Sequence, residues 1–96
     1  MANVIVAEPA RRDLVDLIRT HGLPDSTRER VQRSIEPLGK FPLFGPALTG
    51  RWDGFRFILG PWPWMLIVYV YDQPVDLVIV VTIQDARSAA SPRTIG

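Results

Sequence analysis

The stretch that decides the fold runs from Pro37 to Asp85 and reads PLGKFPLFGPALTGRWDGFRFILGPWPWMLIVYVYDQPVDLVIVVTIQD. Within it, residues 55–59, 64–71 and 75–83 are rich in β-branched and aromatic residues, and short turn-forming segments separate them. This spacing predicts three strands joined as hairpins into a meander. Residues 65–71 contain no charged residue. A strand that is apolar on both faces is buried on both sides, so this segment is predicted to be a central strand.

The segment before these strands, residues 40–50, carries two prolines and two glycines. Such a composition predicts an irregular surface loop. The loop also contains Phe41, Leu43 and Phe44. We expect these large apolar side chains to be tucked beneath the loop, because burial removes their surface from water.

The chain before this stretch predicts one strand and two helices. Asn3–Val6 is a short apolar strand. A helix begins near Pro9, a residue favoured in the first helical turn, and it ends before Gly22. Ser26 and Glu29 have the S-x-x-E spacing of a capping box, which predicts the start of a second helix.

The second helix is predicted to bury a stripe formed by Val31, Ile35 and Leu38. Only a short turn separates the two helices, which favours an antiparallel helical hairpin. The predicted fold class is therefore α+β. It consists of an N-terminal strand and a helical hairpin that packs on an antiparallel sheet with a three-strand C-terminal meander.

Composition limits the function classes. The 96 residues predict a single domain, 1–96, with a weakly ordered tail from about residue 88. The net charge of +1 is not typical of proteins that bind nucleic acid by phosphate neutralisation alone. Without cysteine and with the single His21, no metal site is expected. The apolar runs are too short to span a bilayer and no signal peptide is recognised, so we expect a cytoplasmic protein without membrane contact or cofactor.

Three arginines are candidate catalytic residues. Arg56 interrupts an apolar strand, Arg51 lies just before that strand, and Arg87 follows the last strand. If the three strands form a meander, these cations converge on one concave face. The alternative is that they are solvated charges at the edge of the sheet, or pair with Asp53, Asp72 or Asp85.

Aromatic residues are candidates for partner binding. Trp52 and Trp62 lie around the first hairpin and can stack on bases or anchor a partner protein. The alternative for Trp62, and the preferred interpretation for Trp64, is packing within the hairpin. Tyr69 and Tyr71 share one face of the central strand, in the core or in an interface. His21, at the end of the first helix, is interpreted as a residue that interacts with the helix dipole.

Several short motifs occur in one order along nearly the whole chain. They are Ile35…Leu38…Phe41-Pro42…Gly45, then Leu48-x-Gly50, an apolar strand that ends near Tyr69, and Ile83-x-x-x-Arg87. In this order and at these spacings, the chain resembles the RelE/ParE superfamily of bacterial toxins from type II toxin–antitoxin systems.

The resemblance implies a toxin that inhibits growth and is neutralised by a cognate antitoxin. Members resembling RelE cut mRNA in the ribosomal A site with basic residues, and Arg56 and Arg87 lie near the positions of two of them. However, Ile58 and Met65 stand where further basic residues occur, and the tail has no tyrosine. Members resembling ParE lack much of this set and poison DNA gyrase. The comparison slightly favours gyrase, with a ribosome-dependent endonuclease or a non-toxic interaction module as alternatives.

Overall fold

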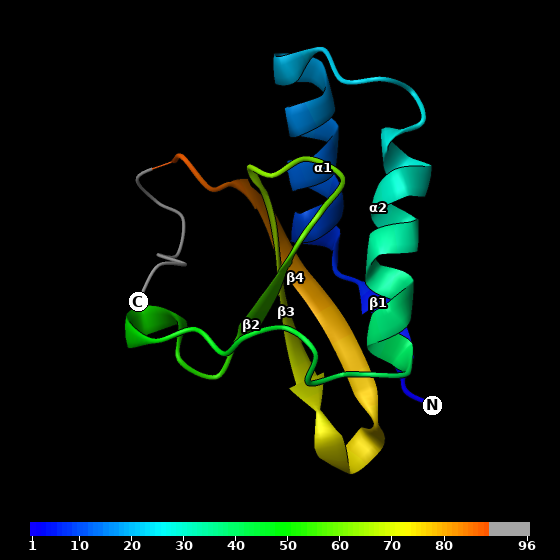
Figure 1. The fold of residues 1–96 in the computed structure, drawn as a ribbon, viewed down its shortest axis with the longest axis vertical. Coiled ribbons are helices and arrows are strands. Elements are labelled where there is room, and N and C mark those ends of the chain that lie inside the picture. The colour runs from blue at the N-terminus through cyan, green and yellow to red at the C-terminus, as the bar shows by residue number, and fades with distance from the viewer. Residues whose placement is uncertain (89–96) are drawn as a thin grey trace.

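The computed structural model describes residues 1–88, and Figure 1 shows a twisted sheet with two helices packed beside it. The elements are strand β1 (Asn3–Val6), helices α1 (Glu8–His21) and α2 (Thr27–Ile35), and strands β2 (Arg56–Leu59), β3 (Met65–Asp72) and β4 (Leu77–Asp85). This is the α+β fold that the sequence predicts. The prediction of a weakly ordered tail concerns residues 89–96, which lie outside the described residues.

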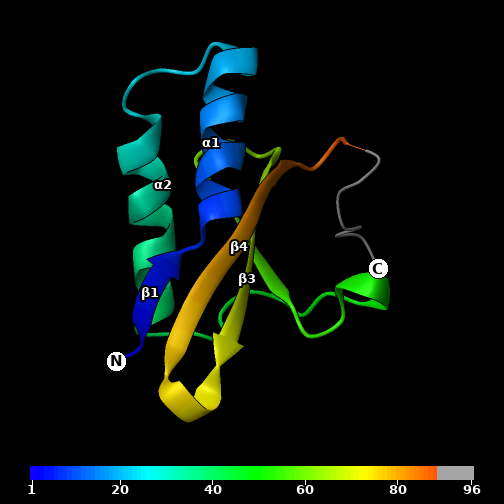
Figure 2. The same cartoon turned by 180° about the vertical axis from the view of Figure 1, so that it is seen from behind.

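The four strands form one sheet in the order β1-β4-β3-β2. β2, β3 and β4 are antiparallel neighbours, which confirms the predicted meander. β1 joins the far edge of the sheet in parallel with β4 (Figure 2). Asn3 lies opposite Leu77 in this pairing. The sheet as a whole is therefore mixed. Parallel neighbours need a long crossover connection, and the helical hairpin forms part of that connection here.

Strand β3 is the most deeply buried strand. Every residue from Met65 to Tyr69 is fully buried. The odd-numbered residues of this range pack in the core beneath the helices, and the even-numbered residues pack on the opposite face with Leu48 and Phe57. Both faces of the central strand are thus covered, as its continuous apolar sequence predicts.

Helix α1 ends at Gly22, which has the left-handed conformation (φ 60°) that suits a helix C-cap. Helix α2 begins at Thr27, but the predicted capping box is not formed. Ser26 has a helical backbone (φ −71°, ψ −3°) and its side chain makes no capping hydrogen bond. A capping residue has an extended backbone, which directs its oxygen at the free N–H groups. Instead, Thr27 Oγ1 donates to the Pro24 carbonyl at 2.6 Å.

The predicted buried stripe of the second helix is confirmed, since Val31, Ile35 and Leu38 are all buried. Leu38 lies in a 3-10 turn, Glu36–Gly39, that continues α2. Pro37 has no N–H to continue the α-helical hydrogen bonds, which accounts for the tighter last turn. Among residues 1–88, no helix is both long and apolar enough to cross a membrane.

The strand boundaries differ slightly from those predicted. β4 begins at Leu77 rather than Val75, because Gln73–Val75 form a 3-10 turn and Asp76 adopts a left-handed conformation (φ 52°). β4 also continues to Asp85, where it pairs with the first residue of β3. Turn chemistry at the residues between two strands, rather than strand propensity, sets these limits.

Helix α1 is fixed to a bulge in the sheet by Asp13. The register of β3 and β4 shifts between Val68 and Tyr69. Asp13 Oδ2 accepts a hydrogen bond from Thr82 Oγ1 at 2.6 Å and from the Ile83 N–H at 3.1 Å. A bulge interrupts the ladder of backbone hydrogen bonds, and Asp13 provides an acceptor there.

Candidate functional site

The loop that follows α2 is fixed to the sheet by two side chains. The Tyr69 hydroxyl, from β3, accepts a hydrogen bond from the Gly45 N–H at 2.9 Å and donates one to the Pro42 carbonyl at 2.8 Å. The Arg56 guanidinium, from β2, donates to the carbonyls of Gly45 at 2.8 Å and Leu43 at 3.5 Å. Because these bonds hold its backbone, we call residues 41–45 the anchored loop.

Gly45 allows the anchored loop to lie directly on the sheet. A Cβ atom at this position would lie 2.2 Å from the Phe57 carbonyl oxygen and 3.0 Å from Cε1 of Tyr69. The first distance is far inside van der Waals contact, so any larger residue would displace the loop. The glycine that ends the Ile35…Leu38…Phe41-Pro42…Gly45 motif is thus required for a steric reason.

The expectation that Phe41, Leu43 and Phe44 are tucked beneath the loop is wrong. Their relative exposures are 59%, 60% and 72%. The space on the sheet side of the loop is filled by Tyr69, and the hydrogen bonds hold the loop backbone there. The apolar side chains therefore point to solvent, and clustered exposed apolar side chains mark binding surfaces.

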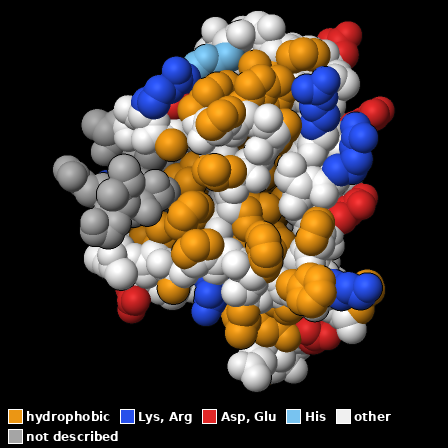
Figure 3. Space-filling model, viewed as in Figure 1, with side chains coloured by type: hydrophobic (Ala, Val, Ile, Leu, Met, Phe, Trp, Pro, Cys, Tyr) orange, Lys and Arg blue, Asp and Glu red, His pale blue; other side chains and the backbone are white. Residues whose placement is uncertain are grey.

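A groove runs between α2 and β2 and ends at the anchored loop. Ser34 and Pro37 line its helical wall, Phe57 and Leu59 line its strand wall, and Phe44 stands at its end. This hollow holds about 360 Å³. A second hollow of about 590 Å³ lies on the other side of Phe44. Figure 3 shows hydrophobic side chains over this face, with Lys and Arg side chains on several sides of them.

The free edge of β2 is partly covered by the chain itself. The Leu48 N–H donates to the Phe55 carbonyl at 2.8 Å, and the Phe57 N–H donates to the Pro46 carbonyl at 3.2 Å. A peptide that adds to a sheet as a further strand needs such groups unpaired. This edge is therefore a poor site for strand addition.

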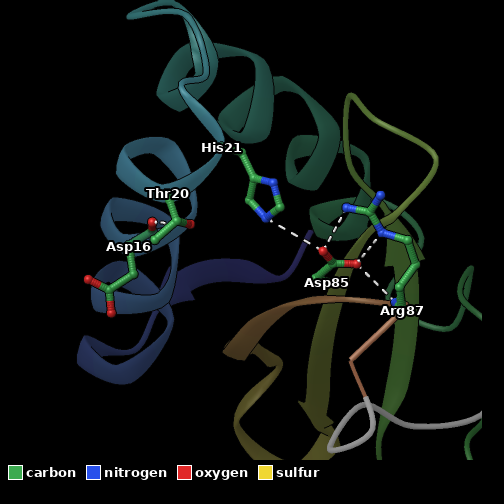
Figure 4. A network of polar contacts seen from close by, with 5 residues as sticks. All are labelled: Asp16, Thr20, His21, Asp85 and Arg87. Carbon is green, nitrogen blue, oxygen red and sulfur yellow. Dashed lines mark hydrogen bonds and ion pairs between the residues drawn. The ribbon is translucent and has the colours of Figure 1, made fainter.

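A second polar cluster gathers where β4 ends (Figure 4). The Arg87 guanidinium donates to both carboxylate oxygens of Asp85, from Nε at 2.8 Å and from Nη2 at 2.7 Å. These bonds lower the pKa of Asp85 to about 2, because they stabilise the ionised carboxylate. His21 Nε2, at the end of α1, lies 3.5 Å from Asp85 Oδ2. His21 thus contacts the end of the sheet as well as its own helix.

Trp62 and Trp64 connect this second cluster to α2. Their rings are stacked with centroids 6.4 Å apart. The guanidinium of Arg30 lies 5.7 Å from the Trp62 ring centroid, and that of Arg87 lies 5.2 Å from the Trp64 ring centroid. The His21 ring is 4.6 Å from the Trp64 ring. This ladder of stacked rings and cations packs the hairpin against both helices, as favoured for Trp64, and the contact with Arg30 joins Trp62 to α2.

The remaining predicted binding residues lie apart from each other. Trp52 packs edge-on against Phe55, with centroids 5.8 Å apart, on the sheet face away from the helices. Tyr69 is fully buried, so it supports the anchored loop from below and offers no surface to a partner. Tyr71 is partly exposed, and its hydroxyl donates to Asp76 Oδ1 at 2.6 Å. Tyr71 also lines the larger hollow beside Phe44.

The candidate catalytic arginines Arg56 and Arg87 do not converge. Arg56 pairs across the sheet with Tyr69, whereas Arg87 follows Ala86, whose N–H bonds to the Trp64 carbonyl. Tyr69 and Trp64, which mark the positions of the two arginines along the sheet, are five residues apart in an extended segment. This separation corresponds to roughly 17 Å. Both guanidinium groups also have intramolecular partners, as the alternative interpretation of edge charges and ion pairs predicts for Arg87.

Arg51 belongs to neither cluster. It is exposed in a 3-10 turn, Gly50–Trp52, in the loop that leads to β2. Among residues 1–88, no group of His, Cys, Asp and Glu side chains is arranged to hold a metal ion. The structure thus contains two candidate surfaces, the groove with the anchored loop and the cluster at the end of β4.

Sequence reasoning missed two features of these surfaces. The exposure of Phe41, Leu43 and Phe44 had no signal in the hydrophobic pattern. The contact of His21 with Asp85 joins residues 64 positions apart in the chain. The only usable signal was the Asp85-x-Arg87 spacing, which suits a local ion pair.

Several solved structures share this fold. The toxin–antitoxin complex RelBE2 from Mycobacterium tuberculosis has 22% identity and a TM-score of 0.65, with 88% of this chain and 96% of its own covered. A copper-bound mutant toxin from Helicobacter pylori has 24% identity, a TM-score of 0.62, and coverage of 88% and 94%. A mutant of YafQ from E. coli has 15% identity, a TM-score of 0.64, and coverage of 95% and 100%.

The predicted resemblance is thereby confirmed at the level of the fold. The chain has the α+β fold of RelE-like type II toxins along nearly its whole length. No protein-family model matches the sequence, and no curated protein matches it.

Proposed function

We propose that this chain is the toxin of a bacterial type II toxin–antitoxin module, which inhibits growth in the cytoplasm and is neutralised by a cognate antitoxin. The observation that carries the proposal is the likeness in fold to the RelBE2 complex and the H. pylori toxin. The exposed apolar side chains of the anchored loop support it further, because a surface of this kind is typical of a protein that binds a partner.

DNA gyrase is slightly favoured over ribosome-bound mRNA as the target. Cleavage of RNA by its own 2′-hydroxyl needs cations at the scissile phosphate. The guanidinium of Arg56 bonds to loop carbonyls, that of Arg87 bonds to Asp85, and roughly 17 Å of sheet separates them. Ile58 and Met65 are buried and apolar. This arrangement supports a protein target rather than an RNA target.

A specific observation favours the ribosome-dependent endonuclease as the second candidate. Arg87 is exposed at 63% of its side chain and lies over Trp64, beside the imidazole of His21. A cation, an imidazole and an aromatic surface together suit the binding of a nucleotide and the removal of a proton from its ribose.

Two assays with purified protein separate these candidates. In a ribosome-programmed translation assay, we expect no cuts in A-site mRNA, and in a supercoiling assay we expect inhibition of DNA gyrase. Codon-specific cuts that Arg87→Ala slows by roughly 100-fold would contradict the gyrase target and establish the endonuclease. Arg51→Ala is the matched control, because Arg51 is exposed and belongs to neither cluster.

A further inference from the structure

The groove between α2 and β2 has an apolar floor. Leu38 and Ile58 line its base and are almost completely buried, with relative exposures of 0% and 8%. Leu59, on the strand wall, is half exposed, and Phe44 rises from the end of the groove at 72% exposure. Since an aromatic side chain buries roughly 150–250 Å² when covered, these residues offer a substantial gain to a ligand that covers them.

Arginines of α2 flank the helical wall of the groove, whose lining residues are themselves uncharged. Ser34 and Pro37 line the groove, and at 100° per residue Arg30 lies on the same side of α2 while Arg33 flanks it. The contact of Arg30 with Trp62 on the β2–β3 turn is consistent with this placement. The same spacing places the carboxylates of α2 and its last turn, Glu29 and Glu36, farther round the helix than Arg33.

A lysine also lies at the other end of the groove. Lys40 lines the larger hollow beside Phe44, together with Phe41 and Leu43. The guanidinium of Arg56 lies beneath the anchored loop. A ligand that spans Phe44 therefore meets apolar surface in its centre and cations at its margins, which calls for apolar anchors flanked by carboxylates.

The backbone of β2 indicates the conformation of the ligand. Residues 46–48 already pair with the edge of β2, at the carbonyl of Phe55 and the N–H of Phe57. An added strand would lack these partners, whereas a helix satisfies its own backbone and needs only side-chain contacts. Hollows on both sides of Phe44 suit apolar residues spaced one helical turn apart.

We propose that this groove binds one amphipathic, acidic helix of the antitoxin, with apolar anchors on both sides of Phe44 and carboxylates facing Arg30, Arg33 and Lys40. This inference rests on the proposed function, because it names the surface and the chemistry by which the antitoxin is held. The surface is preorganised for binding, since the backbone of the anchored loop is already hydrogen-bonded to Tyr69 and Arg56.

The test measures binding of the full chain to the purified product of the adjacent reading frame by titration calorimetry. We expect Phe44→Asp and Leu59→Asp each to weaken binding by at least about 30-fold, the scale of an interface hot spot. Arg33→Glu should weaken it several-fold, more strongly at low salt. Arg28→Glu is the matched control: it reverses a charge on the same helix, but Arg28 lines a hollow against α1.

A further control reports on the opposite edge of the sheet. Ile5, in β1, is 47% exposed, and Ile5→Asp should leave binding unchanged. Thermal melts of every variant exclude unfolding as the cause of lost binding. Binding that resists Phe44→Asp and Leu59→Asp would overturn this groove while leaving the antitoxin partnership intact. Loss of binding with Ile5→Asp or Arg28→Glu that is as large as with the groove variants would overturn it as well. Absence of any complex with the unaltered chain would overturn both proposals.

Discussion

The hydroxyl of Tyr69 accepts the Gly45 N–H at 2.9 Å, across 24 positions of sequence. This bond joins the buried centre of β3 to a loop whose side chains are exposed. Burial raises the pKa of Tyr69 above its ordinary value, so the hydroxyl keeps its proton and can also donate to Pro42. The apolar face that we assign to the antitoxin is thus supported by a core residue that the antitoxin cannot touch.

Removal of the Tyr69 hydroxyl tests this support. Tyr69→Phe keeps the ring in the core but leaves the Gly45 N–H without that acceptor. We expect the free energy of unfolding to fall by about 1–3 kcal/mol, the penalty for an unsatisfied buried group. Urea denaturation measures the loss. Tyr71→Phe removes a hydroxyl that bonds to an exposed partner, Asp76, and should change stability by no more than about 0.5 kcal/mol.

The central position of β3 gives a second prediction. Ile67 is fully buried and lies opposite Ile58 in β2 and Ile83 in β4. Ile67→Asp places a carboxylate among these side chains and should destabilise the protein by at least about 3 kcal/mol. A thermal melt in which this variant matches the unaltered chain would contradict the assignment of β3 as a buried central strand. Val75→Asp, at a site that is 63% exposed, serves as the control.

The ion pair at the end of β4 gives a pH dependence. The pKa of Asp85 is about 2 in the folded chain, below its ordinary value of about 3.9 when unfolded. A carboxylate whose pKa is lower in the folded chain than in the unfolded chain stabilises the fold at pH values above its unfolded pKa. This contribution is lost as the pH falls from about 4 towards 2. Partial exposure screens the pair, so the change in stability is small.

Nuclear magnetic resonance provides the measurement for Asp85. Its side-chain carboxyl carbon should titrate with a midpoint near 2 in the unaltered chain. In Arg87→Ala the midpoint should move up towards the ordinary value, because the largest cause of the shift has been removed. A midpoint that is the same in both proteins would show that Arg87 does not hold Asp85 in solution.

The strands and helices were predictable because their signals are local. The apolar run that begins at Met65 predicts burial on both faces, which the structure shows as far as Tyr69. The helical spacing of Val31, Ile35 and Leu38 predicts one buried face of a helix. The Ser26–Glu29 capping box failed although its spacing is correct. The backbone of Ser26 is itself helical, and a sequence motif does not specify that angle.

The candidate site was predictable only in part, because long-range contacts decide it. Arg56 was recognised as unusual in an apolar strand, yet its partners are carbonyls 11 and 13 positions away. The exposure of Phe41 and Phe44 follows from the bonds that hold the loop backbone, and hydrophobicity alone predicts the opposite. Identifying a residue as special was possible from sequence, whereas assigning its role required the geometry.

The central claim is that this chain is a toxin restrained by its antitoxin, and growth after induced expression tests it most directly. The gene is induced alone, together with the adjacent reading frame, and with that frame interrupted by a stop codon. The account predicts growth arrest in the first and third cultures and normal growth in the second. Normal growth in all three cultures, with the protein detected in each, would contradict the account.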